Sequence, residues 1–440
     1  MKKRLDIVEV FITLAAMPVL LFPTLRPALT VGAMTALVLI WLARWRLVGQ
    51  AWPITRFNHA MLLFTAMIPV GILVSAFPQV TLPKATGLLL GLAVFRTLLL
   101  TVRDRQGFAM TLVGFCILGF AMVSIGVVSA RWLEKIPALT RLGNQIPRLF
   151  TSLPEMRSES VHPNSIAAIL TLCLPIHLGL VRVWRMLPDR RWTRIILAIA
   201  GGIFVLLEAG ILVITQSRTG WISAIAGLLA LWAFSNLHDS RRWIRVLRVA
   251  LPIIFMIIVF IGVFYAGPQQ FWAPLSDSAA PSSIASPVGS INLAGRMELW
   301  GRALVIVRDM PFTGCGLGAF YEVVRHFYPV FQPPPDYYIA HAHNLYLQTA
   351  LDLGLPGLIG YLGLLANALR SCWRTMRRAD RFGKLAAVSL AAGLIAFHVY
   401  GLNDALALGT KPSLLFWIAL ALTALLDVVF TNTLQRNDTL

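Results

Sequence analysis

Long apolar runs recur along most of the 440-residue chain, and this recurrence constrains the fold more than any other feature. Several runs reach the roughly 20 residues that an α-helix needs to cross the hydrocarbon core of a bilayer. The chain is 58% hydrophobic with a mean hydropathy of +0.74, which exceeds the values of ordinary soluble proteins. The sequence therefore predicts an all-α polytopic membrane protein.

Hydropathy predicts about twelve helical spans. They cover approximately residues 7–24, 27–43, 57–77, 82–101, 107–129, 163–184, 194–215, 219–236, 247–266, 343–367, 384–400 and 412–431. The first run has no convincing small-residue cleavage site, so we interpret it as a span and not as a signal peptide. Residues 1–440 are expected to form a single integral membrane domain.

The basic residues follow a membrane pattern. Most of the 38 Lys and Arg fall in short connections that are cytoplasmic if the N-terminus is inside, and an even number of spans then places both termini there. The net charge of +19 is explained by helix orientation and contact with anionic headgroups. Nucleic-acid binding is not expected, because no folded soluble domain would present a basic face.

Two long loops are predicted on the outer side, at 130–162 and 267–342. The second begins with a Ser-, Ala- and Pro-rich stretch, 274–290, which is typical of mobile segments. A helical pattern follows at Arg296–Arg308, and we expect an amphipathic helix that lies at the membrane surface or caps the bundle. Its apolar face would carry Met297, Trp300, Leu304 and Val307, and its polar face Glu298, Arg302 and Asp309. Only Cys315 of the four cysteines lies in this loop, so no disulfide framework is expected.

Arginine is unusual on the outer side of a membrane protein, where the charge bias disfavours it. Arg218 lies between two apolar runs, where it could reach the headgroups or face the bundle interior and hold an anionic group. Arg296 alone could be a solvated charge, but together with Arg218 it could clamp a diphosphate. Arg302 points about 120° away from Arg296 on a helix and is the weaker candidate.

The run Gly314-Cys315-Gly316-Leu317-Gly318 lacks the Lys-Ser/Thr ending and the preceding strand of a nucleotide-binding loop. We interpret it as a tight turn that brings the chain onto the bundle. His341 and His343 could chelate a metal on a strand but diverge if a helix begins near His343, and nearby ligands have no recognisable metal spacing, so no metal is expected. His343, directly before Asn344, suits a general base.

Acidic residues in or near the spans leave two interpretations open. On an unbroken helix Asp352 would face away from His343, so a direct pair of the two is not expected. The Asp352 carboxylate could instead serve the substrate, or it could pair with a neighbouring arginine and hold the bundle in register. Glu208, Asp404 and Lys411 raise the same question. Asp404 and Lys411 flank the last outer connection and could pair with each other or line a substrate cleft.

In this order, the elements resemble the O-antigen ligase and polymerase superfamily of bacterial membrane glycosyltransferases. The resemblance covers about 165–430. It is carried by Ser217–Gly220, Arg296 with Trp300, Pro311–Phe320, and His343–Gln348 followed by Asp352-Leu353-Gly354. Two departures are Asp352, where the family pattern more often has Glu, and the additional histidine at position 341.

The resemblance implies a fold similar to that of GT-C glycosyltransferases, in the bacterial inner membrane, with the active site facing the periplasm. It implies transfer of O-antigen glycan from undecaprenyl diphosphate to a sugar of lipid A-core, inverting and without cofactor or metal. His343, Arg218 and Arg296 would be catalytic. Arg302, Asn344, Asp352, His341 and Lys411 would bind substrate.

Other functions remain open at this stage. An O-antigen polymerase or a protein O-oligosaccharyltransferase would use the same donor with another acceptor. A transporter or flippase for the lipid-linked glycan could use Arg218, Glu208 and Asp352 as a substrate and proton path.

Overall fold

The computed structural model describes residues 2–49, 52–132, 135–150, 161–184, 191–235, 293–330 and 338–431, with a few isolated positions between 243 and 257. Its helices are α1 (Lys2–Leu21), α2 (Pro27–Val48), α3 (Asn58–Leu73), α4 (Pro78–Thr101), α5 (Arg105–Val127), α6 (Pro137–Asn144), α7 (Pro163–Trp184), α8 (Arg191–Ile214), α9 (Arg218–Ser235), α12 (Leu293–Asp309), α13 (Phe320–Phe327), α14 (Leu345–Arg378), α15 (Arg381–Tyr400), a 3-10 turn η2 (Lys411–Ser413), α16 (Leu414–Leu426) and a π-helical turn η3 (Asp427–Thr431). The stretch 274–290 and most of the span predicted at 247–266 lie outside the described residues.

Within the described part, eight helices are long and apolar enough to cross a membrane, which confirms an all-α polytopic membrane protein. The connection between the spans predicted at 343–367 and 384–400 is shorter than those bounds indicate, because α14 continues to Arg378 and α15 starts at Arg381, where Asp380 caps it. The basic residues are spaced along a helix end, where cations favourably meet the C-terminal dipole.

Burial separates an inner from an outer layer of helices. In the most apolar stretches of α7, α15 and α16, 83%, 72% and 83% of the residues are buried. In those of α2, α5 and α8, only 22%, 28% and 22% of the residues are buried. The outer helices therefore expose apolar side chains, as helices facing lipid do. Four cysteines, Cys116, Cys173, Cys315 and Cys372, are free, which confirms that no disulfide links them.

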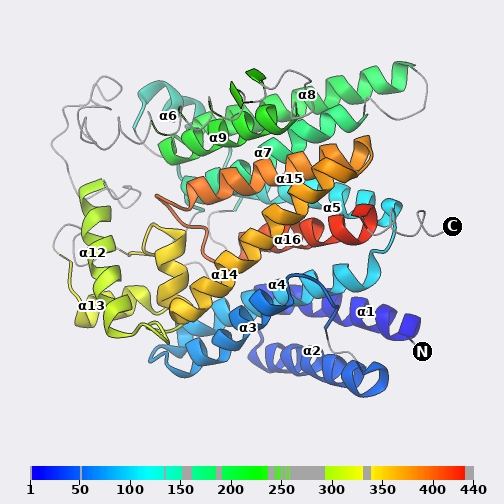
Figure 1. Ribbon diagram of the computed structural model, residues 1–440. Helices are drawn as coiled ribbons and strands as arrows, with labels where there is room; N and C mark the ends of the chain where they lie inside the picture. The colour runs from blue at the N-terminus through cyan, green and yellow to red at the C-terminus, as the bar shows by residue number, and fades with distance from the viewer. Residues whose placement is uncertain are drawn as a thin grey trace.

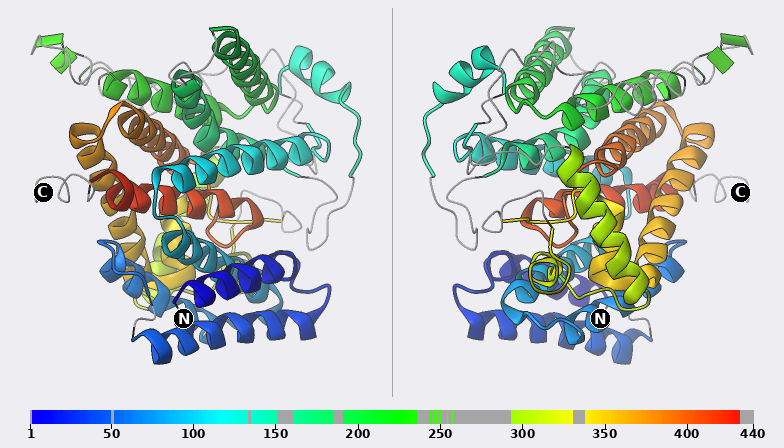
Figure 2. Two further views of the ribbon diagram at one scale, coloured as in Figure 1. Left: turned by 90° about the vertical axis from the view of Figure 1, so that its right-hand side faces the viewer. Right: turned by 90° about the vertical axis from the view of Figure 1, so that its left-hand side faces the viewer.

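The two ends of the bundle differ. The start of α1 and the end of α16 lie at one end, and α12 and α13 lie at the other (Figure 1). Seen from that second end, α12 crosses the bundle in front of α14 (Figure 2), and it packs on α14. The connection after α15 meets three elements at this end: Asn344, which precedes α14, and Arg296 of α12 both donate to it, and Asn403 within it donates to Thr219 at the start of α9.

The helix predicted at Arg296–Arg308 is confirmed as α12, but the face that packs inward is not the predicted apolar stripe. Leu299, Ala303 and Ile306 are buried against α13 and α14, whereas Met297 and Leu304 are 60% and 57% exposed. The helix therefore has apolar residues on two sides. One side caps the bundle, and the other is open at its rim, where a membrane surface would cover it.

The glycine run forms the predicted tight turn. Gly314, Gly316 and Gly318 all have positive φ, and the turn packs on a kink of α14 at Gly354, whose φ is +69°. The Leu355 N–H, freed by the kink, donates to the Pro311 carbonyl at 2.7 Å. The turn and the kink therefore satisfy each other's backbone groups.

Replacing Gly354 by alanine is expected to destabilise the protein strongly. A Cβ at this position would lie 2.3 Å from the Phe312 carbonyl oxygen, and a backbone atom cannot rotate away. Strain and overpacking together should cost about 3 kcal/mol or more. Thermal unfolding in detergent measures the effect. Gly301→Ala on α12 is the matched control, because its Cβ would meet open space, and an equal loss in both variants would contradict the argument.

Candidate active site

Asp404, in the connection after α15, is the centre of an ionic cluster at the α12 end. Its Oδ1 accepts from His343 Nδ1 at 3.0 Å and from the Ala405 N–H at 2.9 Å. Its Oδ2 accepts from Asn164 Nδ2 at 2.9 Å and lies 3.5 Å from a guanidinium nitrogen of Arg296. Burial alone would raise the pKa of Asp404, but the neighbouring His343, which donates a hydrogen bond to it, and the Arg296 guanidinium hold it well below its usual value. The carboxylate is therefore ionised.

His343 is held in a sparsely populated backbone conformation, with φ at +47°. The indole N–H of Trp300 on α12 stabilises it by donating to the carbonyls of Ala342 at 3.0 Å and of His343 at 3.3 Å. Because the Asp404 carboxylate only accepts hydrogen bonds, the contact assigns the proton of a neutral His343 ring to Nδ1. Nε2 then carries the lone pair, which is the arrangement of a histidine general base held by a carboxylate.

His341 lies beside His343, with ring centroids 4.5 Å apart. Its Nδ1 accepts from the His343 N–H at 3.2 Å, and its Nε2 is 3.8 Å from Asp404 Oδ1. Burial and the neighbouring His343 lower the pKa of His341 to about 3, so its ring is neutral at pH 7. Because its Nδ1 is already occupied, His341 is the less available of the two bases.

Of the two arrangements considered for the histidines, the structure has the convergent one, because α14 begins only at Leu345, after both of them. Ligand atoms of His341, His343 and Asp404 lie within 4.8 Å of one another, a group among the described residues that is compact enough for a metal ion. A divalent cation there would lie beside Arg296, 3.5 Å from Oδ2 of the same carboxylate. This repulsion disfavours a metal, so we assign none to the cluster.

Both predicted arginines lie on helices that contact the connection after α15. Arg296 is 7% exposed and donates from NH1 to the Asn403 carbonyl, while its buried Nε has no hydrogen-bond partner among the described residues. The Asn403 amide in turn donates to Thr219 Oγ1 at 2.8 Å, on the residue after Arg218. Asn403 thus links α12 to the N-terminus of α9, where Arg218 is half-buried. Sequence-distant arginines therefore lie at one end of the bundle.

Three further residues enter the cluster that the sequence did not single out: Asn164, which holds Asp404, together with Lys135 and His162. Burial, Arg218 and Arg296 lower the pKa of Lys135 to about 8. Burial lowers the pKa of His162 to about 4 against the opposing charge of Asp404. The only signal in the sequence was position: Lys135 and His162 lie in a long outer loop, and Asn164 lies at the start of the next span. Position alone does not distinguish them from other polar residues there.

Of the predicted substrate-binding residues, Asn344 lies beside the cluster in a supporting position. Its side-chain oxygen caps α14 by accepting from the N–H groups of Tyr346 and Leu347, both at 3.0 Å, and its amide donates to the Leu402 carbonyl at 2.9 Å. An N-cap of this kind is what asparagine does well. Asn344 therefore fixes the start of α14, directly after His343, against the connection that carries Asp404.

Asp352 contacts different partners from those of His343. It accepts from the Gly318 N–H and from Gln348 Nε2, both at 2.9 Å, and lies 3.7 Å from Lys84 Nζ. These contacts tie the glycine turn to α14 and α4. They favour the interpretation of Asp352 as a residue that keeps the bundle in register. Its charged partner is Lys84, whereas a neighbouring arginine was the partner considered from the sequence.

Arg302 and Lys411 are the two remaining residues that the resemblance implies for substrate binding. Arg302 is half-buried on α12, six residues after Arg296, and the α12 arginine that contacts Asp404 is Arg296. Lys411, at the start of η2, places Nζ 4.4 Å from the ring centroid of Phe22. The prediction that these two residues bind substrate stays a prediction.

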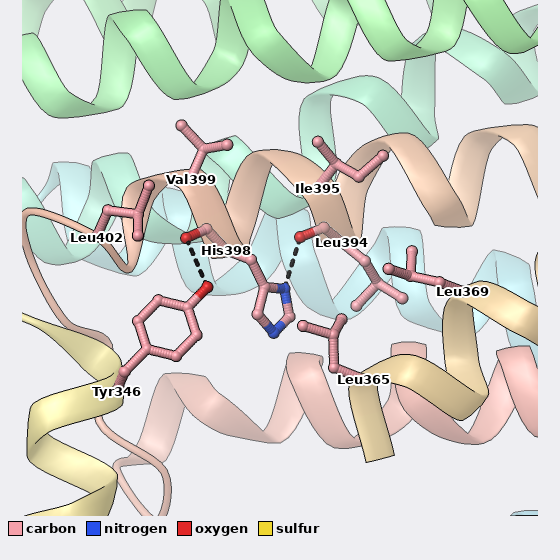
Figure 3. A pocket seen from close by; sticks show the side chains of 8 residues that line it. All are labelled: Tyr346, Leu365, Leu369, Leu394, Ile395, His398, Val399 and Leu402. Atoms are coloured by element: carbon pink, nitrogen blue, oxygen red, sulfur yellow. Dashed lines mark hydrogen bonds between the residues drawn. The ribbon is translucent and has the colours of Figure 1, made fainter. Parts of the chain in front are cut away.

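An apolar pocket of about 180 Å³ opens between α14 and α15. Its polar groups are turned to the backbone: Tyr346 Oη donates to the His398 carbonyl, and His398 Nδ1 donates to the Leu394 carbonyl (Figure 3). The lining residues are Tyr346, Leu365, Leu369, Leu394, Ile395, His398, Val399 and Leu402. Leu402 is two residues from Asp404, so the pocket begins beside the ionic cluster.

The fold and the cluster together define a polytopic helical membrane protein that holds a histidine–aspartate pair among buried cations at one end of its bundle. Residues 202–362 match the family model described as O-antigen ligase, which confirms the resemblance to that superfamily. The matched region contains Arg218, Arg296 and both histidines; Lys135 and Asp404 lie outside it. No curated protein matches the chain at a significant level.

Proposed function

We propose that the protein transfers O-antigen glycan from undecaprenyl diphosphate to a sugar of lipid A-core. The observation that carries the proposal is the pairing of His343 with the buried carboxylate of Asp404, together with Arg296 at the same carboxylate and Arg218 on the adjoining helix end. A base beside cations suits a reaction in which a hydroxyl attacks and a diphosphate leaves.

The chemistry follows from these groups. The acceptor hydroxyl oxygen forms a bond to the anomeric carbon while the bond from that carbon to the diphosphate oxygen breaks, and the electron pair leaves with the diphosphate. His343 Nε2 takes the hydroxyl proton, and Asp404 stabilises the imidazolium that forms. Arg218 and Arg296 stabilise the charge that develops on the leaving group. Attack from the side opposite the diphosphate inverts the anomeric centre.

The apolar pocket supports a lipid-linked donor. Its lining of Leu, Ile and Val side chains beside Leu402 suits a branched hydrocarbon chain attached to a diphosphate at the cluster. With the charge distribution of the sequence, this proposal puts the cluster at the periplasmic face of the inner membrane and both termini in the cytoplasm.

A polymerase or a protein O-oligosaccharyltransferase would use the same cluster with another acceptor. For the transporter alternative, the expected path does not assemble from the described contacts: Glu208 pairs with His177 between α8 and α7, whereas Asp352 lies beside Lys84 of α4. A reaction step also better explains why a base is aligned by a carboxylate.

Purified protein in nanodiscs, incubated with undecaprenyl-diphosphate-linked glycan and lipid A-core, tests the function. We expect a larger conjugate on gels and release of undecaprenyl diphosphate. A product that extends the donor glycan would identify a polymerase instead. Movement of the donor across sealed vesicles with no covalent product would exclude the transferase.

Replacing Arg218 by alanine is expected to lower the transfer rate about a hundredfold, because one preorganised donor to the leaving group is lost. The initial rate of conjugate formation measures it. Arg325→Ala is the matched control, since Arg325 is an exposed arginine on α13 at the same end of the bundle. A normal lipopolysaccharide ladder in cells that carry only Arg218→Ala would contradict the proposed clamp.

A further inference from the structure

The segment that enters α6 is docked on the turn between α8 and α9 by one buried side chain, Gln216. Its Oε1 accepts from the N–H groups of Lys135 at 3.0 Å and Ile136 at 2.7 Å, and its Nε2 donates to Thr140 Oγ1 at 3.2 Å. Gln216 is 1% exposed and has φ at +53°, which is unusual for a non-glycine residue. The docking fixes the backbone of Lys135 beside the helix end that begins with Arg218.

The charges of the ionic cluster act on the ammonium group of Lys135. The described charges that act on it are Arg218, Arg296 and Asp404, of which two are cationic and one is anionic. Lys135 is half-buried. Its burial, which is the larger cause, and the two neighbouring arginines lower its pKa to about 8. Cations brought together away from water repel one another unless an anion lies between them.

A second observation indicates an anion at this place. Arg296 is 7% exposed, yet its Nε has no hydrogen-bond partner among the described residues. An orphaned guanidinium donor is costly when buried and is expected to meet a ligand. Two or more cations with an unused donor suit a ligand with two linked phosphates better than one with a single phosphate.

We propose that Lys135 binds the diphosphate of the lipid-linked donor together with Arg218 and Arg296, and that Gln216 positions Lys135 for this contact. The inference rests on the proposed function and deepens it. Lys135 lies outside the region that matches the family model, so its assignment depends on the contacts of this chain.

Binding of undecaprenyl-diphosphate-linked N-acetylglucosamine and of undecaprenyl monophosphate to the protein in nanodiscs tests the proposal. Lys135→Met is expected to weaken diphosphate binding about tenfold and monophosphate binding less, whereas Lys135→Arg stays near the wild type. Arg141→Met, an exposed cation on α6, is the matched control. Equal binding by Lys135→Met and wild type, or equal weakness of the Met and Arg variants, would overturn it. If the wild type binds neither lipid, the proposed function itself fails.

The pH dependence gives a readout that a structural role would not produce. Because the pKa of Lys135 is about 8, the wild-type KM for the donor is expected to rise as pH increases above 8, where the ammonium is lost. Lys135→Arg should abolish this rise, because arginine stays charged. A rise that persists unchanged in Lys135→Arg would assign it to another group and contradict the proposal.

Gln216→Ala tests the positioning role. The substitution removes the side chain that holds the backbone of Lys135, and it changes no charge. It should therefore raise the donor KM as Lys135→Met does, while kcat changes little. The two changes should not add in the double variant, because residues that act as one unit are non-additive. Additive effects would show that Gln216 does not act through Lys135.

Discussion

His343→Ala is expected to lower the transfer rate about a thousandfold, with little change in the affinity for the lipid-linked donor. The variant removes the base that we propose takes the acceptor proton, and a positioned base contributes about a hundredfold to ten-thousandfold. Single-turnover rates with donor and lipid A-core measure the loss. Direct donor binding separates it from a binding defect.

His341→Ala is the matched comparison for this variant. Both rings lie near Asp404, but His343 is hydrogen-bonded to the carboxylate through Nδ1, which leaves Nε2 for the acceptor, whereas the Nδ1 lone pair of His341 accepts from the His343 N–H. The loss in His341→Ala should therefore be much smaller, about tenfold, through weaker support of the His343 backbone. A reversed order of the two losses would assign the base to His341.

Asp404→Asn is expected to lower the rate by about a thousandfold or more. Both carboxylate oxygens face donors: Oδ1 faces His343 and the Ala405 N–H, and Oδ2 faces Asn164 and Arg296. Either orientation of an asparagine amide sets an NH₂ group against one of these pairs. The His343 ring then loses the partner that fixes its tautomer, which is costly in histidine–aspartate catalysis.

The same substitution also removes a buried counter-charge, so the free energy of unfolding should fall by about 3 kcal/mol. Activity is therefore compared at equal amounts of folded protein, established by gel filtration and thermal unfolding. Asp427→Asn is the matched control, because Asp427 pairs with Arg374 near the opposite end of the bundle. Similar rate losses in both variants would indicate a general folding defect and not a role in the reaction.

The helices were predictable because membrane spans depend on local composition. The windows 163–184 and 384–400 agree with α7 and α15 within a few residues, and the glycine run forms the turn that its residues indicate. The inward face of α12 was not predictable from its pattern. The periodicity of apolar residues predicts a helix, but on a helix with apolar residues on two sides it does not show which side packs on the bundle. Leu299 is buried there, whereas Leu304 is exposed.

The partners within the cluster were beyond the sequence for a physical reason. Asp404 follows His343 by 61 residues, and the two meet only because α14 and α15 run back along each other and return the chain to the same end. Lys135 is brought in by a single buried amide at position 216. Such contacts depend on tertiary packing, which residue spacing along the chain does not encode.

The order in which the cluster residues are made has a consequence for the cell. Lys135 and Arg218 are synthesised early, whereas Asp404 is contributed by the connection before α16, the last helix described. A nascent chain still in the translocon therefore lacks the carboxylate that aligns His343. Under the proposed function, the protein should become reactive only once α15, the 401–404 connection and α16 are inserted, and a chain that stops before Asp404 should not consume donor.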